Sequence, residues 1–126
     1  AVFDLWIGNE DRPLNFKAEL SKGERGILFA VDHGSSLLAC RANIDASLEL
    51  LHRENFPKFH PFQKLVNPMF AGQMIERITS MPDWAIEAAT VYNDIVGKVT
   101  IADQYALYEV LIQRKRHLAK LVEYLL

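Results

Sequence analysis

The spacing of apolar residues changes at Gly34, and this change limits the folds open to the chain more than any other sequence feature. Residues 16–20 alternate apolar and charged side chains, residues 21–26 are polar with two glycines, and residues 27–31 form an unbroken apolar run. This order predicts a half-buried strand, a hairpin turn and a buried strand. After Gly34 the apolar residues follow the spacing of amphipathic helices. The sequence therefore predicts a mainly α fold with a short β-hairpin near the N-terminus.

Helix-start and helix-stop signals divide the remaining sequence. Asn67-Pro68 pairs a cap with proline at the first helical position, and Thr100 precedes Asp103 in a near-capping-box arrangement. Gly97 is the expected stop of the helix before it. The expected helices cover residues 1–7, 43–54, 68–80, 83–96 and 101–126. The last of them should bury a stripe made of Leu107, Leu111, Leu118, Leu121 and Leu125.

We expect one domain over residues 1–126, because no linker, repeat or low-complexity stretch interrupts it. Residues 1–34 hold the candidate functional residues, and residues 35–126 form a helical scaffold. Between two of the helices, residues 55–67 should form an irregular packed connection. Within it, Phe56, Phe59 and Phe62 are expected to anchor the loop in the core.

Composition narrows the classes of function. The formal net charge of −2 provides no basic field, so no nucleic-acid partner is expected. No apolar stretch approaches the roughly 18–20 residues of a membrane span. The single cysteine, Cys40, cannot form an internal disulfide, which is typical of a reducing cytosol, and a cytoplasmic location is expected. An apolar run begins almost directly after Ala1, so we expect a fragment or processed product, although a trimmed initiator Met explains Ala1 equally well.

Within the first 34 residues, an acid, an amide and a second acid follow one another in the order typical of a phosphoryl-transfer site. Asp11 and Asn15 lie in a loop that contains Pro13, and Asp32 follows the second predicted strand. Phosphoryl transfer needs carboxylate and amide oxygens to hold Mg²⁺ and a carboxylate to orient the attacking hydroxyl. Gly34 lets the chain turn sharply away after the second acid. The order therefore predicts a phosphoryl-transfer site.

These residues resemble a known kinase family. Asn9-Glu10-Asp11-Arg12 resembles the Asn-x-Asp-Arg catalytic loop of HipA-like kinases and of phosphatidylinositol 4-kinases, and Ala30-Val31-Asp32-His33-Gly34 resembles their metal-binding motif. Residues 3–9 are similar to the helix that leads into that loop. The closest resemblance is to the bacterial HipA-like kinase domain, specifically to the kinase-like C-terminal lobe. The resemblance covers residues 3–34 well, whereas the later helices are similar only in being amphipathic.

The resemblance implies a role for each residue. Asp11 would be the catalytic base or the acid that orients the hydroxyl, and Arg12 would steady the catalytic loop. Asp32 and Asn15 would each hold a Mg²⁺ ion at the phosphates of ATP. His33 and Gly34 complete the implied cofactor-binding segment. The acceptor would be a hydroxyl group of a protein or a small molecule.

The sequence departs from the family pattern in three ways. Asn15 follows Asp11 by four residues where the pattern has five, and Pro13 stands where many relatives have His or another polar residue. No glycine-rich loop and no strand Lys with a helix Glu precede the motif. We therefore expect this chain alone to be catalytically weak or inactive.

Three other functions stay open. The first is a non-catalytic pseudokinase-like or helical interaction module that docks a partner protein through its amphipathic helices. The second is a phosphotransferase that acts on a small molecule or a lipid. The third is a metal-dependent hydrolase, because two acids and an amide can bind Mg²⁺ for other chemistry.

The remaining polar residues are expected to be structural. His52 and His60 have no metal-ligand spacing, and Cys40 has no neighbouring base to activate it. Residues 114–117 form a basic run that favours a solvated helix face. Arg114 is the exception, because it falls within the leucine stripe, where it either snorkels to solvent or pairs with a loop carboxylate.

Overall fold

Most of the chain is helical, and two antiparallel strands form a hairpin near the N-terminus. The computed structural model describes residues 1–20 and 26–126. Its helices are α1 (Val2–Ile7), α2 (Ile44–Leu51), α3 (Pro68–Thr79), α4 (Asp83–Thr90), α5 (Ile101–Arg116) and α6 (Leu118–Val122). Its strands are β1 (Phe16–Leu20) and β2 (Gly26–Ala30), and 3₁₀ turns cover Arg12–Leu14, Leu37–Ala39 and Glu123–Leu125. The predicted mainly α class with an N-terminal hairpin is confirmed.

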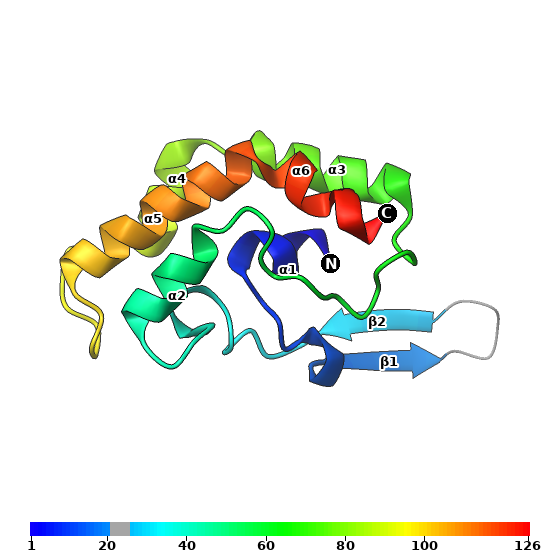
Figure 1. The fold of residues 1–126 in the computed structure, drawn as a ribbon, viewed down its shortest axis with the longest axis horizontal. Helices are drawn as coiled ribbons and strands as arrows, with labels where there is room; N and C mark the ends of the chain where they lie inside the picture. Colours follow the sequence, from blue (N-terminus) through cyan, green and yellow to red (C-terminus); the bar gives the residue numbers. More distant parts are fainter. Residues whose placement is uncertain (21–25) are drawn as a thin grey trace.

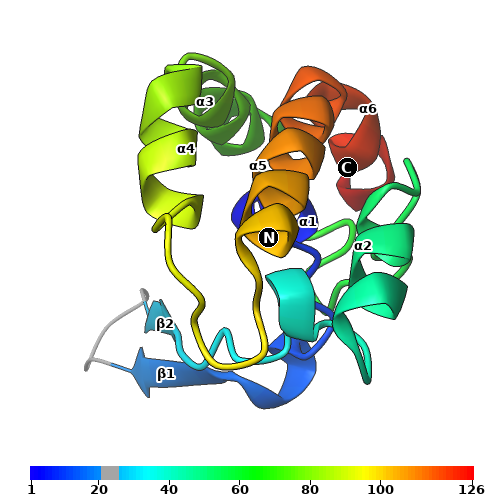
Figure 2. The same cartoon turned by 90° about the vertical axis from the view of Figure 1, so that its left-hand side faces the viewer.

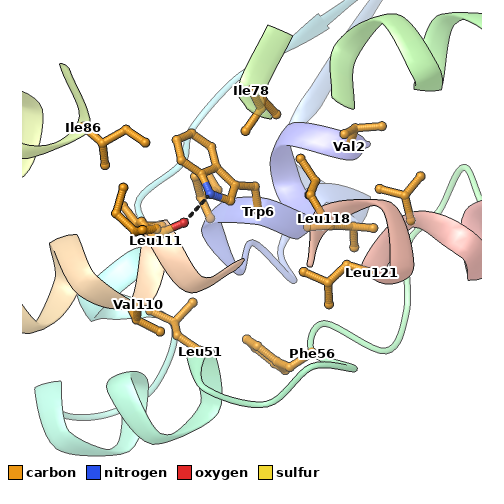
Figure 3. Packing of buried hydrophobic residues seen from close by; sticks show 14 of the residues in the cluster. Val2, Trp6, Leu51, Phe56, Ile78, Ile86, Val110, Leu111, Leu118 and Leu121 are labelled. Carbon is orange, nitrogen blue, oxygen red and sulfur yellow. Dashed lines mark hydrogen bonds between the residues drawn. The ribbon is translucent and has the colours of Figure 1, made fainter. Parts of the chain in front are cut away.

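The short helix α1 lies at the centre of the helical part and contacts α3, α5 and α6 (Figure 1). Viewed end on, α3 and α4 lie on one side of α5, and α2 lies on the other (Figure 2). Trp6 of α1 points into the core beside Ile78 and Ile86, and its Nε1 donates to the carbonyl of Leu111 at 3.0 Å (Figure 3). The segment before Gly34 therefore supplies part of the core.

The hairpin forms where the sequence predicts it. The register pairs Phe16 with Ala30 and Leu20 with Gly26, and the N–H of Val31 donates to the carbonyl of Asn15 at 3.1 Å, which extends the ladder at its base. The predicted turn over residues 21–26 lies largely outside the described residues.

The predicted burial of the two strands is wrong. The hairpin projects from the lower edge of the helical part (Figures 1 and 2), so helices do not cover its length. On the face of β1 that was expected to be buried, Ala18 is exposed and Phe16 is 37% exposed. The large apolar residues of β2 are about half exposed, at 58% for Ile27, 56% for Leu28 and 47% for Phe29.

Local capping signals work as predicted. Asn67 Oδ1 accepts from the N–H of Met69 at 2.9 Å, with Pro68 at the first helical position. Thr100 and Asp103 form both bonds of a capping box, at 3.1 and 2.9 Å. Among residues 1–20 and 26–126, no helix combines the length and apolar character that crossing a membrane requires.

The predicted helix over residues 83–96 ends early, at Thr90. The side chain of Gln104 accepts from the N–H of Tyr92 at 2.8 Å and donates to the carbonyl of Asp94 at 2.6 Å. These bonds hold the backbone after α4 in a non-helical path. Gly97, the expected stop, instead lies in a tight turn with φ of 59°.

The predicted helix over residues 101–126 breaks at His117, where α5 gives way to α6. The carbonyl of Arg114 accepts from the N–H of His117, a 3₁₀-type bond between residues three apart instead of four. His117 itself has non-helical dihedral angles. The break turns α6 against α1. All five leucines of the predicted stripe are buried, as expected: Leu107, Leu111, Leu118, Leu121 and Leu125.

Candidate functional site

The segment expected to be the catalytic loop, residues 9–12, begins where α1 ends. Gly8 closes the helix with φ of 72°, a left-handed conformation that other residues adopt only at a cost. A Cβ at Gly8 would lie 2.6 Å from Cδ2 of Leu51, so packing also requires glycine here. The N–H of Asp11 donates to Oδ1 of Asn9 at 3.0 Å. The chain therefore leaves α1 along a fixed path that places Asp11 and Arg12.

Arg12 joins the loop of Asp11 to the segment of Asp32. Its guanidinium is buried, and each of its five N–H groups has an acceptor. Nε and Nη2 donate to the carboxylate of Asp4, at 2.9 Å for Nε. Nη1 donates to the carbonyls of Asn15 and of Val31, the latter at 3.0 Å. Nη2 also lies 2.9 Å from Nε2 of His33, which accepts its second hydrogen.

Asp4 is the buried anion that balances Arg12. Its side chain lies on α1 and is 3% exposed. Besides Arg12 it accepts from Nδ2 of Asn9 at 3.2 Å and from Nε2 of His60 at 3.1 Å. Burial alone would raise the pKa of Asp4, but the hydrogen bonds from His60 and Arg12 outweigh it and hold this pKa well below its usual range.

His60 completes this buried cluster from the connection between α2 and α3. The N–H of Phe62 donates to Nδ1 of His60 at 3.2 Å. In the neutral ring Nδ1 therefore carries the lone pair, and Nε2 carries the hydrogen that Asp4 accepts. The ring is 1% exposed. The expectation that His60 is structural agrees with its burial, whereas its contact with Asp4 was not foreseen.

Asp11 and Asn15 contact each other directly. Nδ2 of Asn15 donates to the backbone carbonyl of Asp11 and to its Oδ2, each at 3.0 Å. The 3₁₀ turn Arg12–Leu14 brings the amide back over the acid, so the four-residue spacing keeps the two side chains together. The hydroxyl of Ser35 lies 3.4 Å from Oδ2 of Asp11 on the open side.

Asp32 lies at the end of β2 in a strained conformation. Its φ is 49°, uncommon for a residue with a side chain. Oδ1 of Asp32 accepts from the N–H of Gly34 at 2.9 Å. Arg12 holds the residues on both sides, Val31 through its carbonyl and His33 through its ring. The carboxylate of Asp32 is exposed to solvent between these two anchors.

Three side-chain oxygens of this candidate site are of the chemical type that Mg²⁺ takes as ligands. Among the described residues, Oδ1 of Asp11, Oδ1 of Asn15 and Oδ2 of Asp32 accept no hydrogen bond, although the other polar atom of each side chain is engaged. Hard oxygen donors of this kind suit Mg²⁺, which usually takes only one or two carboxylates and completes its shell with water and phosphate. Within residues 1–20 and 26–126 no three or more His, Cys, Asp or Glu side chains form a metal-binding group.

The structure contradicts both environments predicted for Arg114 from its position in the leucine stripe, namely solvent and a loop carboxylate. Its side chain is 3% exposed, so it does not snorkel to solvent, and its partners among the described residues are backbone carbonyls rather than a carboxylate. Burial lowers the pKa of Arg114 to about 10, so it stays charged near neutral pH. Helix C-termini concentrate partial negative charge, and α1 and α2 both end at this side chain. The five acceptors are the carbonyls of Leu5, Trp6, Leu51, Arg53 and Phe56.

The other expectations have mixed outcomes. Phe56 is buried as predicted, but Phe59 is exposed, so only part of the aromatic set anchors the 55–67 connection. His52 is exposed and bonds to Gln113. Cys40 is buried, and burial raises the pKa of its thiol, which agrees with an unreactive residue.

Sequence reasoning missed Asp4 and His60 as members of the site. A signal for Asp4 was available, because it is the one charge in an apolar run that must be buried. For His60 there was none, since it comes from the irregular connection far along the chain. No protein-family model, curated protein or solved structure matches this chain.

Proposed function

We propose that the chain is the kinase-like C-terminal lobe of a HipA-like kinase within a longer protein, serving ATP- and Mg²⁺-dependent phosphoryl transfer to a hydroxyl. The observation that carries this proposal is the guanidinium of Arg12, which ties the loop of Asp11 and Asn15 to the segment of Asp32. Phosphoryl transfer needs these groups at one place, because metal and attacking hydroxyl act on the same phosphoryl group.

Each side chain has a role in this proposal. Asp32 and Asn15 would hold Mg²⁺ through the side-chain oxygens that accept no hydrogen bond from the described residues, and His33 and Gly34 would line the polyphosphate. Bound Mg²⁺ would neutralise charge on the transferred phosphoryl group. Asp11 orients the acceptor hydroxyl and takes its proton. The hydroxyl of Ser35 at Oδ2 of Asp11 supports this role, because a hydroxyl is accommodated at that oxygen.

Productive catalysis requires a second part that grips the nucleotide, and we place that part elsewhere in the complete protein. The acceptor is a hydroxyl of a protein or a small molecule. The proposal includes a cytoplasmic location, because the single cysteine, Cys40, is a free and buried thiol, as is typical of a reducing compartment.

Two substitutions in the complete protein test the assignment. Asp32→Ala should abolish Mg²⁺-dependent ATP binding in calorimetry, whereas Asp11→Ala should abolish turnover and leave binding largely intact. Glu109→Gln, which removes an exposed acid from α5, is the control and should change neither. Tight Mg²⁺·ATP binding by Asp32→Ala would overturn the metal assignment, and full turnover by Asp11→Ala would exclude Asp11.

A second candidate is a helical interaction module. Large side chains on α3 and α4 are exposed, with Phe70 at 60% and Trp84 at 71%. Such side chains are typical anchors of protein interfaces when they cluster. If the complete wild-type protein binds no Mg²⁺·ATP, the module becomes the better assignment.

A further inference from the structure

A continuous path of hydrogen bonds leads from His60 to both neighbours of Asp32, and it is buried as far as Arg12 and partly buried beyond it. His60 donates to Asp4, Asp4 accepts two bonds from Arg12, and Arg12 contacts Val31 and His33. We infer that His60 and Asp4 are positioning residues that set the conformation of Asp32 for the metal. This inference rests on the proposed function, because it concerns the same site.

The orientation of Asp4 depends on His60. Oδ1 of Asp4 accepts from Arg12 and Asn9, and Oδ2 accepts from Arg12 and His60. The carboxylate is thus fixed from both sides in its plane. Without His60, Oδ2 of this buried carboxylate would keep the bond from Nε of Arg12 but lose its second hydrogen bond, and the carboxylate would turn to recover it. In the wild-type chain the ring of His60 is itself held by the N–H of Phe62, so it gives Asp4 a donor at a fixed position.

The guanidinium of Arg12 transmits such a turn to Asp32. A guanidinium is planar and rigid, so rotation at Asp4 displaces all its donors together. Two of those donors hold the carbonyl of Val31 and the ring of His33. Asp32 between them has a left-handed backbone conformation, with φ of 49°, which is less stable for an L-residue than the right-handed one. The strained Asp32 therefore depends on contacts that begin at His60.

A manganese titration followed by NMR tests the inference. Mn²⁺ stands in for Mg²⁺ and broadens backbone amide signals near its binding site, even when binding is weak. In the wild-type chain we expect selective broadening at Asp11, Asn15 and residues 32–34. His60→Leu should need about tenfold more Mn²⁺ for equal broadening, since partners of metal ligands typically contribute that much or more.

Two further variants separate positioning from stability. His60→Gln keeps an amide donor and should stay closer to wild type than His60→Leu. Ile78→Val removes one core methyl group, lowers stability, and should leave the titration unchanged. His60→Asn, whose amide is too short to reach Asp4, replaces His60→Leu in the comparison if His60→Leu does not fold.

The outcomes distinguish the inference from the function on which it rests. Selective wild-type broadening that His60→Leu, or its replacement, leaves unchanged would overturn the positioning role and preserve the metal site. Equal weakening by Ile78→Val would also overturn it, because stability alone would then explain the effect. No selective broadening in the wild type would overturn the metal site itself, and the positioning role with it.

Discussion

Two arginines illustrate how single residues organise this molecule. Arg12 and Arg114 are both buried, and both use all five N–H groups. Arg12 faces a carboxylate, whereas Arg114 faces carbonyls at the ends of α1 and α2. Lysine has three donors on a flexible stem and could not reproduce either set. The fork geometry of arginine, more than its charge, is what these positions require.

Arg114→Met should strongly destabilise the chain. The substitution leaves carbonyl groups in the core without donors, and each unsatisfied group costs about 1–3 kcal/mol. With five such carbonyls, we expect the free energy of unfolding, measured in urea, to fall by at least about 5 kcal/mol in total. Arg116→Met changes an exposed arginine of the same helix and should stay within about 0.5 kcal/mol. Equal effects of the two substitutions would contradict a special role for Arg114.

Asp4 should make stability depend on pH. Its folded pKa lies below the unfolded value of about 3.9, so its carboxylate contributes stability above that pH and loses it as pH falls further. At pH 7, Asp4→Asn should lower the free energy of unfolding by about 3–5 kcal/mol, because Arg12 loses its anion. Urea titrations should show this difference shrinking below about pH 4. A difference that stays constant down to pH 2.5 would contradict the linkage.

The sequence identified the candidate site only in part. Asp11, Asn15 and Asp32 were recognisable because they stand within a short motif, and their local order limits where they can lie. Asp4 and His60 belong to the same cluster through tertiary packing. A histidine that reaches a carboxylate 56 residues away leaves no trace in local spacing.

At the scale of elements, alternation and turn residues located the hairpin but not its burial. An apolar run such as residues 27–31 usually indicates a buried strand. The ring of Phe62 lies 5.4 Å from that of Phe16 in β1, but the large apolar side chains of β2 remain about half exposed. Periodicity shows which side chains share a face, whereas burial depends on what packs against that face.

Helix starts were easier to predict than helix ends. Asn67 and Thr100 cap helices with side chains within three residues, so their signals are local. The end of α4 depends on Gln104, which lies in the next helix. The break at His117 depends on how α6 packs on α1. Neither dependence is visible in a short window of sequence.

Gln104→Leu should loosen the segment after α4. The substitution removes the acceptor of the Tyr92 N–H and the donor to the Asp94 carbonyl. We expect the amide of Tyr92 to exchange with solvent at least tenfold faster, equivalent to about 1.4 kcal/mol, within the usual cost of an unsatisfied group. Gln73→Leu, an exposed glutamine on α3, is the matched control. Unchanged exchange at Tyr92 would show that Gln104 does not hold this segment.

At the scale of the whole molecule, the candidate functional segment, residues 1–34, packs into the helical scaffold of residues 35–126. Helix α1 gives the core four buried residues, and its last carbonyls bind Arg114. Asp4 of the same helix anchors Arg12. The division at Gly34 separates sequence patterns, whereas the packing crosses it.

Residues 35–126 alone should therefore fail to fold cooperatively. Removing Trp6 alone would cost about 3–5 kcal/mol, and natural domains have only about 5–15 kcal/mol in total. Urea unfolding followed by circular dichroism should show a sigmoidal transition for residues 1–126 and none for residues 35–126. As a control, replacing residues 17–29 with a short Gly-Ser linker keeps α1 and Arg12 and removes most of the exposed hairpin, so the transition should persist. A cooperative transition of residues 35–126 at the wild-type midpoint would mean that α1 merely rests on an independent helical core.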